Sequence, residues 1–417
     1  MKRIDMLPFR RDRGTPAGAG GLPRICFLFN AQLHQLMHGI TTAAALARSG
    51  EAEVHVAIAS EANLAFAERL VARMGGAPIH FSRAGSAPLH RLAQARGSAV
   101  PPKLLTLMSI VPWIDRFDAV AIPERTSLAL KRMGATRPRF IHLDHGAGDR
   151  EAGIDRRIAR FDFVLMAGEK QRDRFWREGL IRPGRHAVVG YPKFEAADLA
   201  RDPDWRPFAD DRPTVLYNPH FAAIGSWARF ARPLIDAFAR QDRFNLIVAP
   251  HVRMFDRRAR RAEGRDLLAR YAGLPHIRID LGSDHSVDMS YTATADVYVG
   301  DVSSQIYEFI RRPRPCLFLN AHRVRWAHDE NYAHWRLGTV VEDLPDPVAA
   351  VEASIAGFPA FAEAQRVRFA ETFDLDGPPA STRAAAAIAG FLRRSFSNAT
   401  VPEAVVPGAG SGLSFGR

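Results

Sequence analysis

Several polar side chains of this 417-residue chain stand directly after apolar runs that predict β-strands, and their types are suited to group-transfer chemistry. In a doubly wound parallel sheet the carboxyl ends of the strands meet the ligand, so these residues are candidates for a site. His145, in HLDHGAG, offers an imidazole whose ordinary pKa suits general base catalysis near neutral pH. We expect Asp144, or another nearby carboxylate, to orient this ring, and Gly146 to leave it open to a ligand. The alternative is a plain turn, with Gly146 at a positive-φ position.

A second candidate is the stretch 291–320, in which an apolar strand ends in GDVSS and runs into an amphipathic helix predicted over 303–311. Unpaired backbone N–H groups, the positive end of the helix dipole and the hydroxyls of Ser303 and Ser304 would converge at one point. Such a junction is suited to a nucleotide phosphate. The alternatives are an ordinary helix cap and, for Glu308 one helical turn further on, a solvated surface position.

Three further basic residues follow predicted strands of the second half of the chain. His251 and Arg253 stand in VAPHVR, and His220 stands in YNPHFAAIGS. Arginine binds phosphate with bidentate geometry, so Arg253 is a candidate anion ligand, and the alternative is a helix-start histidine beside a surface arginine. His34 and His38 have the i, i+4 spacing of some metal ligands, but no carboxylate or cysteine completes the set, so we assign no metal site there.

The elements that must position these residues alternate between short apolar strands and amphipathic helices. This alternation predicts an α/β protein with two doubly wound, Rossmann-like domains, at 24–199 and 213–394, joined by a polar linker at 200–212 and facing one another across a cleft. We expect a flexible basic segment at 1–23 and a disordered tail at 395–417. The expected strands are 25–29, 54–58, 79–81, 119–122, 140–143, 163–166 and 187–189 in the first domain, and 214–217, 245–248, 277–279, 297–299 and 316–319 in the second.

Composition narrows the class of protein. The net charge of +12 is spread along the chain instead of gathering with aromatic residues in one tract, which argues against nucleic acid as a partner. Cys26 and Cys316 stand within apolar strands and are expected to be core residues. The N-terminus lacks the apolar stretch of a secretory signal, so we expect a cytoplasmic protein. The apolar segment 103–114 is either a buried core helix or a helix lying on an anionic membrane surface.

The motifs and their order resemble those of the CDP-glycerol glycerophosphotransferases, which polymerise teichoic-acid-like chains. The resemblance covers roughly 140–343 and is carried by the His-Gly at 145–146, by His251, by the Tyr, Ala-Asp, strand and Asp-x-Ser-Ser pattern from Tyr291 to Ser304, and by Arg336. The chain departs from the family at Val302, where a tyrosine is usual. It also lacks the family's lysine before His251, and it has Leu337 between Arg336 and the glycine.

The resemblance implies a GT-B fold and the transfer of a polyol phosphate from a CDP-linked donor to a hydroxyl of a polysaccharide or lipid-linked acceptor. No cofactor is implied. His145 would deprotonate the acceptor hydroxyl, which attacks the β-phosphorus while CMP leaves. The remaining implied roles are donor binding by His251, Arg253, Asp301, Ser303, Ser304, Glu308 (ribose) and Arg336, and pocket lining by Gly146 and His220.

Two alternatives remain open. One is a UDP-sugar glycosyltransferase or a 2-epimerase-like enzyme of the same fold, although serines at 303 and 304 in place of paired glycines favour the phosphotransferase. The other is a non-catalytic, basic docking protein of a polysaccharide assembly complex.

Overall fold

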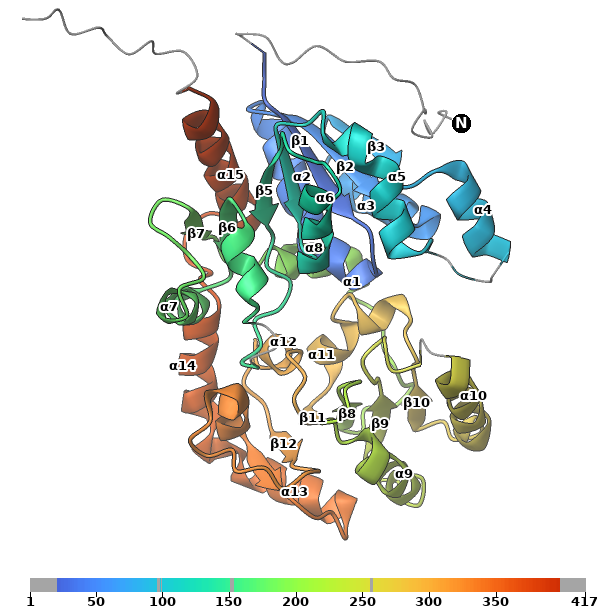
Figure 1. The fold of residues 1–417 in the computed structure, drawn as a ribbon. Coiled ribbons are helices and arrows are strands. Elements are labelled where there is room, and N and C mark those ends of the chain that lie inside the picture. The colour runs from blue at the N-terminus through green and yellow to red at the C-terminus, as the bar shows by residue number, and fades with distance from the viewer. Residues whose placement is uncertain (1–20, 96–97, 99, 151–153, 256–257, 398–417) are drawn as a thin grey trace, which may run out of the picture.

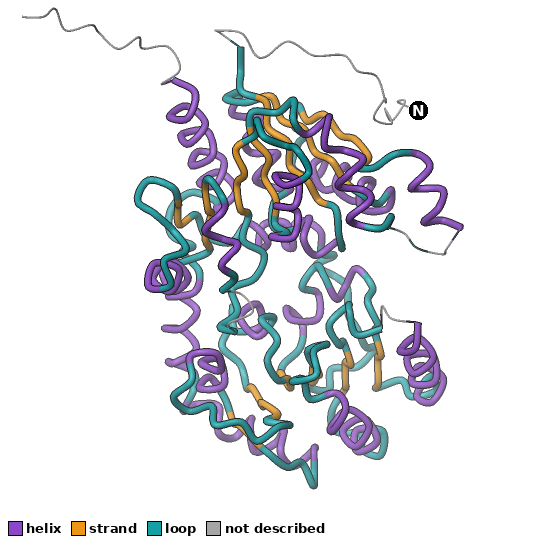
Figure 2. Tube along the Cα trace, viewed as in Figure 1, coloured by secondary structure: helices purple, strands orange, loops and turns teal. Residues whose placement is uncertain are grey.

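The computed structural model describes residues 21–95, 98, 100–150, 154–255 and 258–397, so most of the basic N-terminal segment and nearly all of the expected tail lie outside the described residues. The described chain forms two parallel β-sheets with helices packed against them, one sheet in each lobe of the molecule (Figures 1 and 2). The predicted fold class is confirmed.

The first sheet has seven strands in the order β3-β2-β1-β4-β5-β6-β7. The order reverses at β1, as in a doubly wound sheet. Both faces of β1 are buried: Phe27 packs with the helices on one face of the sheet, and Leu28 packs with α5 on the other. Burial on both faces explains why these strands have nearly continuous apolar sequences. The strands are β1 (Arg24–Phe29), β2 (Glu53–Ile58), β3 (Ile79–Arg83), β4 (Ala119–Ile122), β5 (Arg139–His142), β6 (Phe163–Met166) and β7 (His186–Val188).

The second sheet has six strands in the order β10-β9-β8-β11-β12-β13, again all parallel. Five of them are the predicted strands, and β13 was not predicted. The strands are β8 (Thr214–Asn218), β9 (Asn245–Val248), β10 (Ile277–Ile279), β11 (Val297–Gly300), β12 (Cys316–Leu319) and β13 (Thr339–Val341). Both cysteines are buried and unbridged within strands, as predicted.

The helices of the first lobe are α1 (Leu33–Leu36), α2 (Ile40–Ser49), α3 (Glu61–Arg73), α4 (Ala87–Ala95), α5 (Lys103–Ile114), α6 (Ala129–Arg132), α7 (Glu169–Arg177) and α8 (Pro192–Ala200). The second lobe contributes α9 (Trp227–Phe238), α10 (Arg258–Tyr271), α11 (Ser290–Thr294), α12 (Ile306–Phe309) and α13 (Pro347–Gly357). Two further helices, α14 (Ala362–Thr372) and α15 (Ala380–Ser397), return to the first lobe (Figure 1). There α15 packs on α2, and the rings of Phe163 and Phe391 stack with centroids 4.7 Å apart.

The helix predicted over 303–311 is wrong in extent, because α12 covers only Ile306–Phe309. Ser303 is not its N-cap; that position is held by Gln305, whose side chain makes no capping bond. The helix ends soon afterwards because Pro313 disfavours a helical conformation at the residue before it. So short a helix provides little of the dipole that the sequence interpretation relied on.

The apolar segment 103–114 is the helix α5, and one of its sides belongs to the core through Leu107, Ile110 and Ile114. Its other side is exposed at Leu104 and Met108. None of the described helices combines the length and the hydropathy that a bilayer crossing needs.

Candidate functional site

Five histidines meet where the carboxyl ends of the two sheets face one another, and we call His34, His38, His145, His220 and His251 the histidine cluster. The ring centroids of His34, from the first lobe, and His251, from the second, lie 6.2 Å apart. His220 lies 5.5 Å from His251, and His38 lies 6.4 Å from His145. The sequence predicted roles for His145, His220 and His251. It predicted none for His34 and His38, because their spacing suggested only a metal site that no third ligand completed.

Burial makes the histidine cluster uncharged at neutral pH. Desolvation, followed by repulsion from neighbouring histidines and basic side chains, lowers the pKa of His34 and of His220 to about 3. Desolvation together with Arg253 lowers the pKa of His251 to about 4, and desolvation together with Arg125 lowers that of His145 to about 4.

Three rings of the cluster have spare hydrogen-bonding capacity. The buried Nδ1 atoms of His34, His38 and His145 have no partner in the described part of the chain. A neutral imidazole offers one donor and one acceptor, so a bound ligand could satisfy these atoms.

Asp144 does not orient His145 through Nδ1, contrary to the expected pairing. One Asp144 oxygen, Oδ2, is buried without a partner among the described residues, and the side chain of Gln171 hydrogen-bonds to this carboxyl. Desolvation by burial raises the pKa of Asp144 to about 6. The ion pair of Lys103 and Glu124, whose Nζ and Oε2 atoms are 2.6 Å apart, also acts electrostatically on His145. Burial opposes ionisation of Glu124, but Lys103, together with hydrogen bonds from Thr126 and Gln35, outweighs it and lowers the pKa to about 2.

Asp301 shapes the site through the backbone instead of facing a ligand. Its carboxylate accepts from the backbone N–H groups of His220 at 3.0 Å and Ser226 at 2.6 Å, so it fixes the loop that carries His220. Its carbonyl oxygen accepts from Trp335 Nε1 at 2.7 Å. These contacts engage the buried Asp301 carboxylate with backbone groups of the chain itself. The expected direct contact between Asp301 and the nucleotide-linked donor does not fit this geometry.

The segment with Ser303 and Ser304, which we call the serine turn, meets the loop that carries His145. Ser304 is exposed, whereas Ser303 is buried and its Oγ accepts from the backbone N–H of Gln305 at 3.4 Å. A Cβ atom added at Gly148 would lie 3.0 Å from the Cβ of Ser304, so a larger residue there would press on the turn. The structure thus brings the His145 motif and the GDVSS motif of the sequence into contact.

Glu308 is neither a solvated surface residue nor a free ribose ligand. Its Oε1 accepts from Lys193 Nζ at 2.5 Å and from the Tyr191 hydroxyl at 3.4 Å, and both members of the ion pair are buried. Lys193 comes from the first lobe, so this pair joins the lobes beside the histidine cluster. The sequence gave no sign of it because the partners are 115 positions apart.

Two arginines lie against the second-lobe histidines. The Arg150 guanidinium lies 3.4 Å from the ring nitrogens of His220. Arg253 lies exposed over the Phe221 ring at 4.5 Å, and its backbone N–H donates to His251 Nδ1. Arg150 is a candidate anion ligand that the sequence analysis did not consider.

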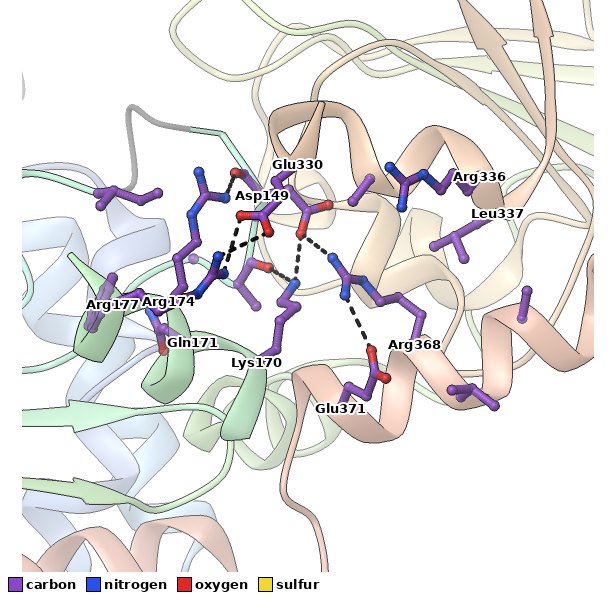
Figure 3. A pocket seen from close by; sticks show the side chains of 18 of the residues that line it. Asp149, Lys170, Gln171, Arg174, Arg177, Glu330, Arg336, Leu337, Arg368 and Glu371 are labelled. Carbon is purple, nitrogen blue, oxygen red and sulfur yellow. Dashed lines mark hydrogen bonds and ion pairs between the residues drawn. The ribbon is translucent and has the colours of Figure 1, made fainter. Parts of the chain in front are cut away.

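A pocket of about 470 Å³ lies on the other flank of the His145 loop, between α7, the 3₁₀ segment η5 (Glu330–Leu337) and α14 (Figure 3). Gly146 and Gly148 form part of its wall. Arg336 lines this pocket and donates to the carbonyl oxygen of Ala327 at 2.8 Å, so it is not part of the histidine cluster. The other charged residues of the wall are Asp149, Lys170, Arg174, Arg177, Glu330, Glu363, Arg368 and Glu371.

Asp149 is the most highly connected side chain of this pocket. Its carboxylate accepts from Lys170 Nζ at 3.0 Å, Arg368 at 3.0 Å, the Tyr307 hydroxyl at 2.5 Å and the backbone N–H of His334 at 3.0 Å. Three of these partners belong to elements that follow the first sheet in sequence, so Asp149 fastens the His145 loop to the rest of the chain.

Comparison with solved structures identifies the overall architecture. The wall teichoic acid polymerase TagF, in a structure with CDPG, aligns with a TM-score of 0.56 and 11% identity over 90% of this chain and 89% of that chain. The structure of S. aureus MnaA with UDP aligns with a TM-score of 0.57 and 12% identity, over 90% of this chain and 97% of that chain. A protein from Listeria monocytogenes that is assigned as a UDP-N-acetylglucosamine 2-epimerase aligns with a TM-score of 0.56 and 13% identity, over 91% of this chain and 98% of that chain.

The chain has the GT-B fold. At these identities the alignments show the fold alone. No protein-family model matches the chain, and no curated protein matches it.

Proposed function

We propose that this GT-B chain is a glycerophosphotransferase-like enzyme that transfers a polyol phosphate from a CDP-linked donor to a hydroxyl acceptor in the synthesis of a cell-surface polysaccharide or teichoic-acid-like polymer. The observation that carries the proposal is the meeting of His145 with a group of uncharged histidines from both lobes, next to the serine turn. A neutral imidazole with an unpartnered nitrogen can accept a proton.

In this mechanism the second lobe holds the donor diphosphate. His220, His251, Arg253 and Ser304 supply N–H and O–H donors, and Arg150 adds charge beside His220. Because the rings of the cluster are buried against one another, the donor enters when the lobes part. The rings then exchange contacts with each other for contacts with phosphate oxygens.

The chemical step is a displacement at the β-phosphorus. The acceptor oxygen forms a new P–O bond while His145 takes the hydroxyl proton. The bond from the β-phosphorus to the bridging oxygen breaks, and CMP leaves with the electron pair. Donors aimed at the diphosphate stabilise the charge that develops on this leaving group.

The pocket beside the His145 loop is our proposed route for the acceptor. Its wall carries Lys170, Arg174 and Arg336, which suits an acceptor chain that contains phosphate. For an acceptor held on a lipid, the exposed side of α5 at Leu104 and Met108 is the surface we propose for peripheral contact with an anionic cytoplasmic membrane face.

The second candidate is a UDP-sugar glycosyltransferase or 2-epimerase-like activity. The comparison with MnaA favours it as much as the comparison with TagF favours the phosphotransferase, since their TM-scores are 0.57 and 0.56. The purified chain should therefore be incubated with CDP-glycerol, CDP-ribitol and UDP-sugars, and the released nucleotide identified. CMP release supports the proposal, UDP release supports the second candidate, and release of neither nucleotide supports a docking protein.

The role of His145 is tested with His145→Ala. We expect turnover to fall by about 10²- to 10⁴-fold, the usual worth of a general base, while CDP-glycerol affinity measured by calorimetry stays within a few-fold of the wild type. His322→Ala, at an exposed position, is the matched control. Undiminished turnover by His145→Ala would contradict the mechanism.

A further inference from the structure

Three side chains with metal-binding chemistry gather at the amino ends of β2 and β3, at the opposite end of the first sheet from the histidine cluster. Glu53 and His55 are alternate residues of β2, so their side chains leave the same face of the sheet. His80 is the direct neighbour of His55 across the β2–β3 pair. All three therefore point to one side, the side that α5 covers.

The ligand atoms of these side chains are already close together. One atom from each of Glu53, His55 and His80 lies within 4.8 Å of the other two. The His55 Nε2 and Glu53 Oε1 atoms are 2.6 Å apart, and the rings of His55 and His80 stack with centroids 4.6 Å apart. Tetrahedral Zn²⁺, with bonds of about 2.0 to 2.2 Å, separates its ligand atoms by roughly 3.3 Å. Side-chain rotations that also break the stacking of the two rings would bring the three atoms to that separation.

Aromatic and basic side chains surround the three ligand side chains. Phe117 and Trp113 pack edge-on against His55, with ring centroids 4.9 and 6.5 Å away, and form an apolar wall on one side. Arg24 Nε lies 3.6 Å from Glu53 Oε1 and can hold that oxygen while the second oxygen binds an ion. Glu53 is only partly buried and His80 is exposed, which leaves an open path from solvent.

We propose that Glu53, His55 and His80 bind one divalent transition-metal ion, with Zn²⁺ as the best-fitting ion and solvent completing its coordination. Two imidazoles and one carboxylate form a ligand set that zinc uses in proteins. Because β3 is the edge strand of the sheet, the ion would fasten this strand to β2 and act on stability, away from the proposed chemistry. Among the described residues, the histidine cluster offers no comparable gathering of three ligand atoms.

The test uses the full chain, stripped with EDTA and then freed of the chelator. Titration with ZnCl₂ by calorimetry should show one saturable site per chain, and the melting temperature should rise with zinc concentration. His80→Ala removes one ligand at an exposed position and should weaken zinc binding by more than the 10- to 100-fold typical for loss of an outer partner of a metal site. His322→Ala, also exposed, should bind like the wild type.

Further variants guard against a site elsewhere and against misfolding. Glu53→Gln keeps the shape of the side chain but removes the ligand charge, so it should also weaken binding while its metal-free melting temperature stays near that of the wild type. The proposal fails if the wild type shows no saturable site, if His80→Ala binds normally, or if binding is lost in His251→Ala instead. Nucleotide release is measured separately and does not enter this test.

Discussion

The charge of Asp149 should be worth more to this protein than any exposed ion pair between the same elements. Asp149 is 2% exposed and accepts hydrogen bonds from Lys170 and Arg368, both at 3.0 Å. Asp149→Ala would leave two cations near one another without their shared counter-charge. Removal of one partner of a buried pair costs about 3–5 kcal/mol. At about 2–4 °C per kcal/mol for a unit of 150–250 residues, the melting temperature should fall by roughly 6–20 °C.

A matched control lies in the same pocket (Figure 3). Arg177 and Glu330 also join α7 to η5, at 3.1 Å, but their side chains are 62% and 58% exposed. Exposed pairs contribute about 0–1 kcal/mol, so Glu330→Ala should shift the melting temperature by less than about 4 °C. Thermal unfolding followed by circular dichroism measures both. Equal shifts in Asp149→Ala and Glu330→Ala would refute the reasoning from burial.

The pH dependence of this difference has a definite sign. Burial opposes ionisation of Asp149, but Lys170, His334 and Arg368 outweigh it and hold the pKa well below its usual range. A carboxyl whose pKa is lowered by folding contributes its full stabilisation above the unfolded pKa of about 3.9 and loses it as the pH falls toward the folded value. The gap in melting temperature between wild type and Asp149→Ala should therefore be widest near pH 7 and should narrow below about pH 4. A gap that widens on acidification would contradict the assignment.

Two further predictions concern the proposed phosphotransfer. His145 must be neutral to act as a base, and burial with Arg125 lowers its pKa to about 4. The kcat/KM of the enzyme should therefore rise through about pH 4 and stay level from about pH 6 to 8; an acid limb centred near 6.5 would show that His145 is not the base. A bound diphosphate should raise the lowered pKa of His251, so donor binding at pH 6 should take up protons and tighten as the pH falls. Calorimetry in buffers of different ionisation heat measures this uptake, and an uptake in His251→Ala as large as in the wild type would contradict it.

The strands were predictable because parallel strands buried on both faces have sequences unlike their surroundings. The exception is β13, where Thr339–Val341 is only three residues long and lies next to the irregular η5 segment. Packing between distant parts of the chain gave no such signal. The amphipathic pattern of α15 shows that it is a helix, but not that it packs on α2 of the first sheet.

The candidate site was predictable wherever a polar residue follows a strand, as for His145 and His251. The role of a site residue was not predictable where that role depends on a contact with the other lobe. His34 was given no role, because no third ligand completed a metal site with His38, and only the structure placed His251 beside it. In the same way, Glu308 was expected to bind ribose, with a solvated surface position as the alternative, and neither interpretation indicated its pair with Lys193.

The uncharged state of the histidine cluster explains how two lobes with a basic overall composition can close on one another. Five imidazolium rings at these spacings would repel one another and would have to be desolvated, and both effects oppose closure. Because burial lowers the pKa of each ring with a resolved shift, the lobes pack at neutral pH without that repulsion. An arriving diphosphate reverses the balance at His220 and His251, since its charge favours the protonated form of the rings that contact it. The same burial that keeps the cluster neutral without a ligand therefore makes it responsive to an anion. A substitution that exposes the cluster should weaken this response to an anion before it unfolds the chain.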